Sequence, residues 1–364
     1  MHETDRSVTE AVQSSREVNP NMAQVSDPYI REQLEKRREE LNLAIAAVPS
    51  EVPAAPYLEL LGEVDTAIER LEEGTFGVCL ECHGTVEKER LIADPLVKVC
   101  LDCLTTDDRR ALERDLELAS SVQRGLLPEK DVRFSGWIIH YEYKPAGHVS
   151  GDYCDLIQPR GADGRLIFLL GDVAGKGLAA SLLMSHLHAM FRSLSDPRAG
   201  TPLELDKLVE TANRVFCEST FAGQYATLIC GAAGGKGELE FASAGHLPAL
   251  LVRRDGVRQI GSTGLPLGLF SSSRYAIQRV RMEPGDSLLL FTDGISEAGN
   301  AAGQEYTVQR LANVAGERHR WAPQELLAAC LKDVASHTCG ARPKDDQTLM
   351  VVHRSETAGV ALND

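Results

Sequence analysis

Apolar residues recur at two spacings along the chain: every three or four residues near the start, and in short continuous runs further on. The first spacing is typical of amphipathic helices. It predicts two helices with apolar stripes at Ile30, Leu34, Leu41 and Ile45 and at Leu61, Val64, Ile68 and Leu71. The segment 49–56 separates them, because its prolines cannot continue a helix. We expect an antiparallel hairpin, which either buries its own apolar faces or binds a partner.

A third helix is expected from Asp107, a residue type that caps helix N-termini well, to Leu127, just before Pro128. Its apolar positions lie along one side, at Leu112, Leu116, Ala119, Val122 and Leu126. Such a stripe packs either on the core of the same chain or on a partner helix, and the pattern alone leaves both open.

Short apolar runs of strand length dominate the rest of the chain. They predict strands at 137–143, 153–158, 165–170, 225–232, 238–242, 249–252, 276–282, 287–292 and 347–353. Helical spacing predicts helices at 179–194, 203–219, 308–314 and 323–336. Strands at hairpin-like spacing, with helices in pairs, favour an α+β layered domain.

Four aspartates stand at the ends of these apolar runs: Asp152, Asp172, Asp293 and Asp345. Any one of them alone is as well explained by a turn or a helix cap. Together they repel one another unless cations lie between them, and oxygen donors without His or Cys suit Mg²⁺ or Mn²⁺. A cation of this kind can lower the pKa of a bound water and so generate a nucleophile.

Two CxxC pairs, Cys79 with Cys82 and Cys100 with Cys103, indicate a second kind of metal site. Four thiolates close a tetrahedron around Zn²⁺ at about 2.3 Å and leave no open position, which is typical of a structural site. His83 adjoins the second cysteine but is not needed as a ligand. A disulfide or redox pair is the alternative. The remaining cysteines, Cys154, Cys217, Cys230, Cys330 and Cys339, fall in apolar segments and are expected to be buried.

The composition narrows the class of protein. The chain has 364 residues, 43% of them hydrophobic, and a net charge of −15, which disfavours nonspecific contact with nucleic acid or anionic lipid. No apolar run approaches 18 residues, and the polar first residues lack a signal-peptide core, so we expect a cytoplasmic protein with no membrane contact and no direct contact with nucleic acid.

From Leu112 to His353 the chain resembles the metal-dependent phosphatases of the type 2C fold, and in particular their SpoIIE/RsbU branch. The resemblance rests on VSGDYCD (149–155), GDVAGKGLAASLLM (171–184), FASAGHLPALL (241–251), PGDSLLLFTDGISEA (284–298) and DDQTLMVV (345–352). It implies two central sheets flanked by helix pairs, an αββα sandwich. It also implies hydrolysis of phosphoserine or phosphothreonine on a signalling protein, such as an anti-sigma-factor antagonist.

The same resemblance implies roles for individual residues. Asp172 would bridge two Mn²⁺ or Mg²⁺ ions, and the backbone carbonyl of Val173 would join one of them. Asp293 and Asp345 would complete the other, and Asp152 would act directly or through a metal-bound water. Asp172 and Asp293 are thus the expected catalytic residues, acting through a metal-bridging hydroxide. Relatives of this branch use the helix that corresponds to residues 107–127 to couple a sensory domain to the active site, often in a homodimer.

Other polar residues near these motifs have weaker claims. Asp346 is a poorer candidate for a metal ligand than Asp345, and Asp155 is expected to orient its strand. His148 is a candidate proton donor or a surface residue, and His246 is expected to brace a loop. Lys176 either meets a substrate phosphate or is simply solvated. The chain has no arginine between residues 133 and 160, so phosphate binding is expected to rest largely on the metals.

From about Asp27 to Leu104 the chain resembles the DksA/TraR zinc-finger family, through GTFGVCLEC, the run from Arg90 to Pro95 and the closing CxxC. In DksA the hairpin tip carries acidic residues that reach into RNA polymerase. Here the tip sequence is VPSEVPAAP, with Glu51 as its one charge, so the zinc site is carried over and polymerase binding is kept as an alternative.

The predicted organisation has six parts. They are a disordered tail (1–26), a helical hairpin (27–73), a DksA/TraR-like zinc finger (74–104), a linker helix (105–128), a phosphatase domain (129–355) and a flexible tail (356–364). The favoured function is a phosphatase regulated through its N-terminal half. The alternatives are a DksA-like transcription regulator with a phosphatase-like domain and a non-catalytic scaffold.

Overall fold

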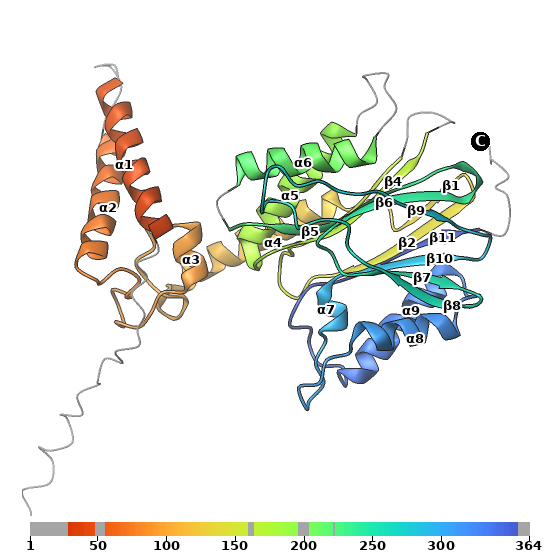
Figure 1. Ribbon diagram of the computed structural model, residues 1–364. Coiled ribbons are helices and arrows are strands. Elements are labelled where there is room, and N and C mark those ends of the chain that lie inside the picture. The colour runs from red at the N-terminus through yellow and green to blue at the C-terminus, as the bar shows by residue number, and fades with distance from the viewer. Residues whose placement is uncertain (1–27, 48–54, 159–163, 196–203, 221–222, 356–364) are drawn as a thin grey trace, which may run out of the picture. The chain divides into compact units, whose positions relative to one another are not determined.

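The computed structural model describes residues 28–47, 55–158, 164–195, 204–220 and 223–355 (Figure 1). Both predicted tails, the hairpin tip with Glu51, and residue 203 of a predicted helix lie outside the described residues. The chain divides into two compact units, with the boundary between residues 113 and 114. In the described part of the chain, no helix is long and apolar enough to cross a membrane.

The predicted helical hairpin is confirmed in the first unit. Helix α1 (Pro28–Ala47) packs beside α2 (Ala55–Glu72), as Figure 1 shows. Ile30 and Leu34 from α1 are fully buried, as is Val64 from α2. The helices therefore stabilise each other mainly by burying their apolar stripes.

The cysteine-rich segment shares this core. Helix α3 (Lys88–Ala93) and the short 3-10 turn η1 (Leu101–Cys103) fold around the four cysteines. Phe76, Val86 and Leu91 are buried in the same apolar cluster as the stripes of α1 and α2. The zinc module thus packs on the hairpin and has no separate core of its own.

Helix α4 (Thr106–Leu126) crosses the boundary between the units. The prediction that Asp107 caps it is wrong. The Thr105 hydroxyl accepts the Asp108 N–H at 3.1 Å, so Thr105 is the N-cap and Asp107 lies in the first turn. Because threonines and aspartates follow one another here, residue type alone could not choose the cap. Val122 is 58% exposed, so the predicted apolar stripe is not buried along its whole length.

The second unit contains two sheets, in which every pairing between named strands is antiparallel. The six-stranded sheet has the order β1 (Asp131–Phe134), β2 (Trp137–Lys144), β11 (Gln347–Arg354), β10 (Ser287–Phe291), β7 (Ala249–Arg253), β8 (Gly256–Ile260). The five-stranded sheet has the order β3 (Asp152–Ile157), β4 (Leu166–Val173), β5 (Ala226–Ala233), β6 (Glu238–Ala244), β9 (Gln278–Arg281).

Helix pairs cover the outer faces of both sheets, which confirms the predicted αββα sandwich (Figure 1). Helices α5 (Gly177–Leu194) and α6 (Leu205–Ser219) pack on the five-stranded sheet. Helices α8 (Val308–Glu317) and α9 (Pro323–His337) pack on the six-stranded sheet. Apolar side chains from both sheets fill the space between them. The central strands are consequently buried on both faces, which is why they read as continuous apolar runs.

The pattern missed the edge strands β1 and β8 and the short helices α3 and α7 (Asp293–Ser296). Strand β8, Gly256–Ile260, buries only its last residue, so its sequence carries little apolar signal. Edge strands of this kind are specified by their partner strand more than by their own composition.

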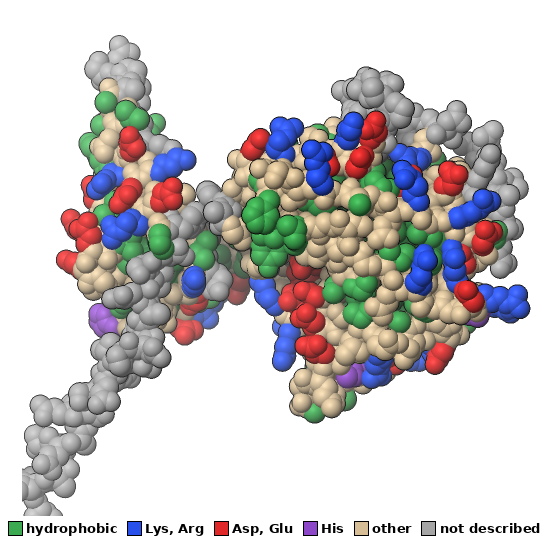
Figure 2. All heavy atoms as spheres, in the orientation of Figure 1, with side chains coloured by type: hydrophobic (Ala, Val, Ile, Leu, Met, Phe, Trp, Pro, Cys, Tyr) green, Lys and Arg blue, Asp and Glu red, His purple; other side chains and the backbone are tan. Residues whose placement is uncertain are grey.

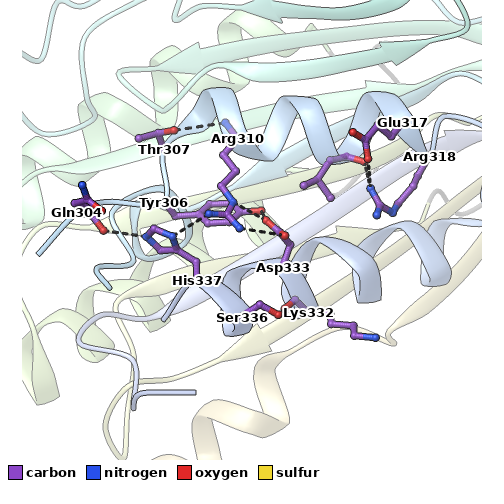
Figure 3. Close-up of polar contacts among 11 residues, drawn as sticks. Gln304, Tyr306, Thr307, Arg310, Glu317, Arg318, Lys332, Asp333, Ser336 and His337 are labelled. Carbon is purple, nitrogen blue, oxygen red and sulfur yellow. Dashed lines mark hydrogen bonds and ion pairs between the residues drawn. The ribbon is translucent and has the colours of Figure 1, made fainter. Parts of the chain in front are cut away.

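A polar network anchors the segment that follows α7 (Figure 3). Asp333 on α9 accepts hydrogen bonds from Arg310 Nε and the Tyr306 hydroxyl, both at 2.8 Å. His337 Nδ1 accepts from Arg310 Nη1 at 3.0 Å, so its Nε2 carries the proton and donates to the Gln304 carbonyl at 2.9 Å. These contacts tie the loop after α7 to both α8 and α9.

Candidate active site and zinc site

The four cysteines of the two CxxC pairs form one cluster. Their Sγ atoms all lie within 4.8 Å of one another, and the Cys82 and Cys100 sulfurs are 3.6 Å apart. Thiolates about 2.3 Å from one zinc ion stand roughly 3.8 Å apart in a tetrahedron, so the spacing fits. None of the chain's nine cysteines forms a disulfide, and His83 is not part of the cluster. The chain therefore contains a four-cysteine zinc-binding site.

Backbone N–H groups favour the thiolate form of Cys79, whereas burial and neighbouring thiols raise the pKa of Cys100, and neighbouring thiols and burial raise that of Cys103. The Cys100 N–H points at Cys79 Sγ at 3.3 Å, and the Gly84 N–H points at Cys82 Sγ at 3.4 Å. Hydrogen bonds from the backbone of Cys82 and Cys100 lower the pKa of Cys79 to about 6. A cysteine ionised at neutral pH is ready to bind a metal.

The sheet topology also brings together the four predicted aspartates, which we call the carboxylate cluster: Asp152, Asp172, Asp293 and Asp345. Pairing of β3 with β4 places Asp152 directly opposite Asp172. Asp293 opens α7 at the end of β10, and Asp345 precedes β11, the neighbour of β10. Two ends come from each sheet, so the cluster lies at one edge of the sandwich.

The carboxylates are close enough to oppose one another's ionisation. Burial and the charges of Asp293 and Asp345 raise the pKa of Asp172 to about 7. Burial followed by the charge of Asp345 raises the pKa of Asp293. Buried and partly buried carboxylates in mutual repulsion, with only oxygen donors, suit hard divalent cations. Among the described residues only the thiols gather within 4.8 Å of one another, so the carboxylates are more widely spread.

Asp152 is the most buried member, at 1% exposure. Burial, and then the charge of Asp172, raise its pKa well above the usual value. Its Oδ2 accepts hydrogen bonds from the Thr292 hydroxyl at 3.0 Å and from the Thr348 hydroxyl. The two threonines, which sequence reasoning missed, fix the orientation of this carboxylate.

Asp346 and Gly151 position the loop that leads into β3. Asp346 accepts the Ala146 N–H at 2.7 Å and the Gly151 N–H at 2.9 Å, so it holds this loop through both carboxylate oxygens. A Cβ at Gly151 would lie 3.1 Å from the Val173 carbonyl oxygen and 3.6 Å from Asp172 Oδ1. Only glycine leaves room for the close approach of this loop to β4.

Gln123 on α4 is a second residue that sequence reasoning missed. Its amide donates to the Ser150 carbonyl at 2.7 Å and accepts the Ser150 N–H at 3.0 Å. The Ser150 hydroxyl in turn accepts the Asp152 N–H at 3.1 Å. Gln123 is 5% exposed, and a buried glutamine beside an apolar stripe was the one available signal. Helix α4 is therefore linked to the carboxylate cluster by two successive hydrogen-bonded contacts.

The remaining candidate residues either support the fold through hydrogen bonds or lie at the surface. Asp155 is fully buried and binds Arg192 through both oxygens, at 2.6 and 2.8 Å, which ties β3 to α5. His246 donates from Nε2 to the Phe291 carbonyl, and burial lowers its pKa to about 4, so it braces the end of β10 as expected. His148 is exposed, and Lys176 Nζ lies 2.6 Å from Asp345 Oδ2.

The expectation of buried cysteines outside the zinc site is correct for three of them, Cys154, Cys230 and Cys330. Cys217 is only partly buried, and Cys339 is exposed. Cys339 follows the last turn of α9 with a φ of 52°, and this turn carries its side chain to the surface.

Two family models match the chain. The model of stage II sporulation protein E (SpoIIE) matches residues 162–355, more than half of the chain, and includes three of the four clustered aspartates but not Asp152. The model of the prokaryotic dksA/traR C4-type zinc finger matches residues 74–109.

Individual proteins are similar over the same region. The chain is 26% identical over 251 residues to the phosphoserine phosphatase RsbU of Bacillus subtilis, covering 68% of this chain and 72% of RsbU. It is 25% identical over 270 residues to the protein IcfG of Synechocystis sp., covering 66% of this chain but only 42% of IcfG. The fold matches the SiaA-PP2C domain of Pseudomonas aeruginosa with a TM-score of 0.58 at 19% identity, covering 68% of this chain and 98% of that domain.

Proposed function

The chain belongs to the SpoIIE family, and from this membership we propose that it is a metal-dependent phosphatase of phosphoserine or phosphothreonine on a signalling protein. The observation that carries the proposal is the carboxylate cluster, in which burial and mutual repulsion raise the pKa values of Asp152, Asp172 and Asp293. Such an arrangement is unfavourable without cations and becomes favourable with them. A scaffold without activity would have no use for it.

We assign the ligands of two Mn²⁺ or Mg²⁺ ions to Asp152, Asp172, the Val173 carbonyl, Asp293 and Asp345. Carboxylates spread more widely than one coordination sphere suit a pair of ions better than one. When bound, the ions supply positive charge that acidifies water and neutralises phosphoryl oxygens. Asp172 and Asp293 act by holding that charge in place, and in-line attack by water needs no protein nucleophile.

The surrounding residues keep the cluster in a fixed geometry. Thr292 and Thr348 orient Asp152, and Asp346 holds the loop beside it. Positions fixed before the substrate arrives reduce the reorganisation needed in the transition state. Lys176, beside Asp345, reduces the net negative charge that an incoming phosphate meets.

The N-terminal unit supplies regulation in this proposal. One Zn²⁺ held by Cys79, Cys82, Cys100 and Cys103 stabilises it, and α4 connects it to the catalytic unit through Gln123. Leu118 and Val122 on α4 are 65% and 58% exposed, and a partner helix in a homodimer would cover them. The match to the dksA/traR zinc finger also supports a second candidate, in which this unit binds RNA polymerase.

The test is hydrolysis of a phosphoserine peptide by the full chain with Mn²⁺ or Mg²⁺. Activity should disappear with EDTA and fall by several orders of magnitude in Asp172→Asn and Asp293→Asn. Asp255→Asn, which changes an exposed aspartate in the turn between β7 and β8, is the matched control. Undiminished turnover in either cluster variant would refute the assignment.

A further inference from the structure

A groove of about 540 Å³ opens beside the carboxylate cluster. Its walls are the end of β2, the segment after α7, the last turns of α9 and the loop 338–345. Asp345 and Gly294, the neighbour of Asp293, lie in its lining. A chain segment bound in this groove would therefore run directly into the proposed catalytic centre.

Three cationic side chains border the groove: Lys144, Arg342 and Lys344. All three are exposed, and none forms an ion pair with another part of the chain that the structure describes. The lining also contains three acids: Glu142 pairs with Lys130 at 2.8 Å, Asp345 pairs with Lys176 at 2.6 Å, and Glu297 follows α7. In Figure 2, acidic side chains gather over α7, with Lys and Arg side chains beside them. The groove thus offers cations that are free to pair with a ligand.

The lining of the groove also contains apolar side chains. Ala298 lies after α7, and Leu331 and Val334 come from α9. Cationic and apolar side chains in one groove suit a polypeptide, which can offer acidic and apolar side chains to them, better than a small anion. The guanidinium of Arg342 adds a planar fork that can bind a carboxylate through two hydrogen bonds.

We propose that this groove binds the polypeptide beside the phosphoserine of the substrate, and that Arg342 and Lys144 select acidic residues there. The proposal rests on the proposed phosphatase activity and adds the class of substrate. The chain has no arginine between residues 133 and 160. Arg342 comes from a different segment and provides a guanidinium in the same groove lining as Asp345. The loop that leads into Asp345 would thus recognise acidic residues of the substrate.

The experiment compares two phosphoserine peptides that differ only in flanking residues, Glu in one and Gln in the other. The wild-type full chain should hydrolyse the acidic peptide with about a tenfold higher kcat/KM. In Arg342→Gln and in Lys144→Gln this ratio should fall toward one. Arg320→Gln, which changes an exposed arginine outside the groove, should keep the wild-type ratio.

A charge swap sharpens the test, because Arg342→Glu should prefer a peptide with Lys flanks over the acidic one. Equal kcat/KM of the wild type for the acidic and Gln peptides, or an unchanged ratio in both groove variants, would overturn the proposal. Mn²⁺-dependent hydrolysis of p-nitrophenyl phosphate is measured in parallel. If it persists while the ratio fails, only the groove assignment is wrong; if it too is absent, the proposed phosphatase function fails.

Discussion

The zinc site and the carboxylate cluster both gather acidic side chains, but at different spacings. Four thiols from two short knuckles gather within 4.8 Å, where backbone hydrogen bonds lower the pKa of Cys79 while the pKa values of Cys100 and Cys103 are raised. The aspartates come from segments far apart in the sequence, and burial opposes their ionisation. A closed set of ligands stabilises a fold, whereas a wider and strained set leaves room for substrate and water. The difference in spacing fits a structural role for the cysteines and supports the proposed catalytic role of the aspartates.

The largest expected effect lies in the zinc site. Replacing Cys79 and Cys82 together by Ser should remove one zinc and unfold residues 74–104, because thiolate binding contributes on the order of 10 kcal/mol to such folds. Since the cysteines share a core with the hairpin, α1 and α2 should lose helicity as well. Zinc analysis and circular dichroism measure both changes. Cys339→Ser is the control, and wild-type protein without zinc under reducing conditions would refute the site.

The carboxylate cluster should make the metal-free protein sensitive to pH. The pKa of Asp172 is raised to about 7 in the fold, above its ordinary value of 3.8, so the folded state binds the proton more tightly. Stability should therefore fall as the pH rises from about 4 to 7, by at most about 4 kcal/mol, and level off above pH 7. Partial exposure of the side chain will reduce the measured value.

Denaturant unfolding of the full chain in EDTA, at several pH values, measures this loss of stability. Asp172→Asn should make the profile less steep, since the neutral amide does not titrate, whereas Asp152 and Asp293, whose pKa values are also raised, still do. Asp255→Asn should keep the wild-type slope, because that side chain is exposed. Identical slopes in all three proteins would mean that Asp172 is not under electrostatic strain.

The hydroxyl partners of Asp152 should contribute a smaller amount. Thr348→Val removes a donor from a buried carboxylate while keeping the shape of the side chain, which should cost about 1–3 kcal/mol. It should also raise the Mn²⁺ concentration needed for half-maximal activity, because Asp152 is freer to rotate. Thr66→Val, at an exposed position of α2, is the control. If the variant matches wild type in both stability and Mn²⁺ dependence, Thr348 does not orient Asp152.

The smallest expected effect on stability belongs to Gln123. Gln123→Leu removes both hydrogen bonds to the backbone of Ser150, which should lower the stability by about 1–2 kcal/mol. It should also loosen the loop before Asp152. Turnover should become less sensitive to loss of the zinc unit, because the link from α4 is broken. The comparison is turnover of the wild type and of Gln123→Leu, each with and without the two Cys→Ser substitutions. Equal responses to zinc loss in both backgrounds would make the helix only a tether.

Sequence patterns predicted the central strands because both of their faces are buried, and they predicted the aspartates because each follows or precedes an apolar run. They could not predict Thr292 and Thr348, which meet Asp152 across 140 and 196 residues of sequence. Gln123 likewise reaches Ser150 across 27 residues. These contacts depend on strand order and register, which composition does not encode. The polar edge strand β8 was not predicted for a related reason, because its pairing with β7 specifies it more than its own composition does.

The central claim is that the carboxylate cluster, and not the cysteine cluster, holds the divalent cations of catalysis. The direct measurement is calorimetric titration of Mn²⁺ into the zinc-loaded full chain, alongside Asp172→Asn, Asp255→Asn and the double Cys→Ser variant. The account predicts two bound Mn²⁺ ions in the wild type and in Asp255→Asn, retained binding in the cysteine variant, and loss of binding in Asp172→Asn with its zinc still present. Undiminished Mn²⁺ binding in Asp172→Asn would contradict it.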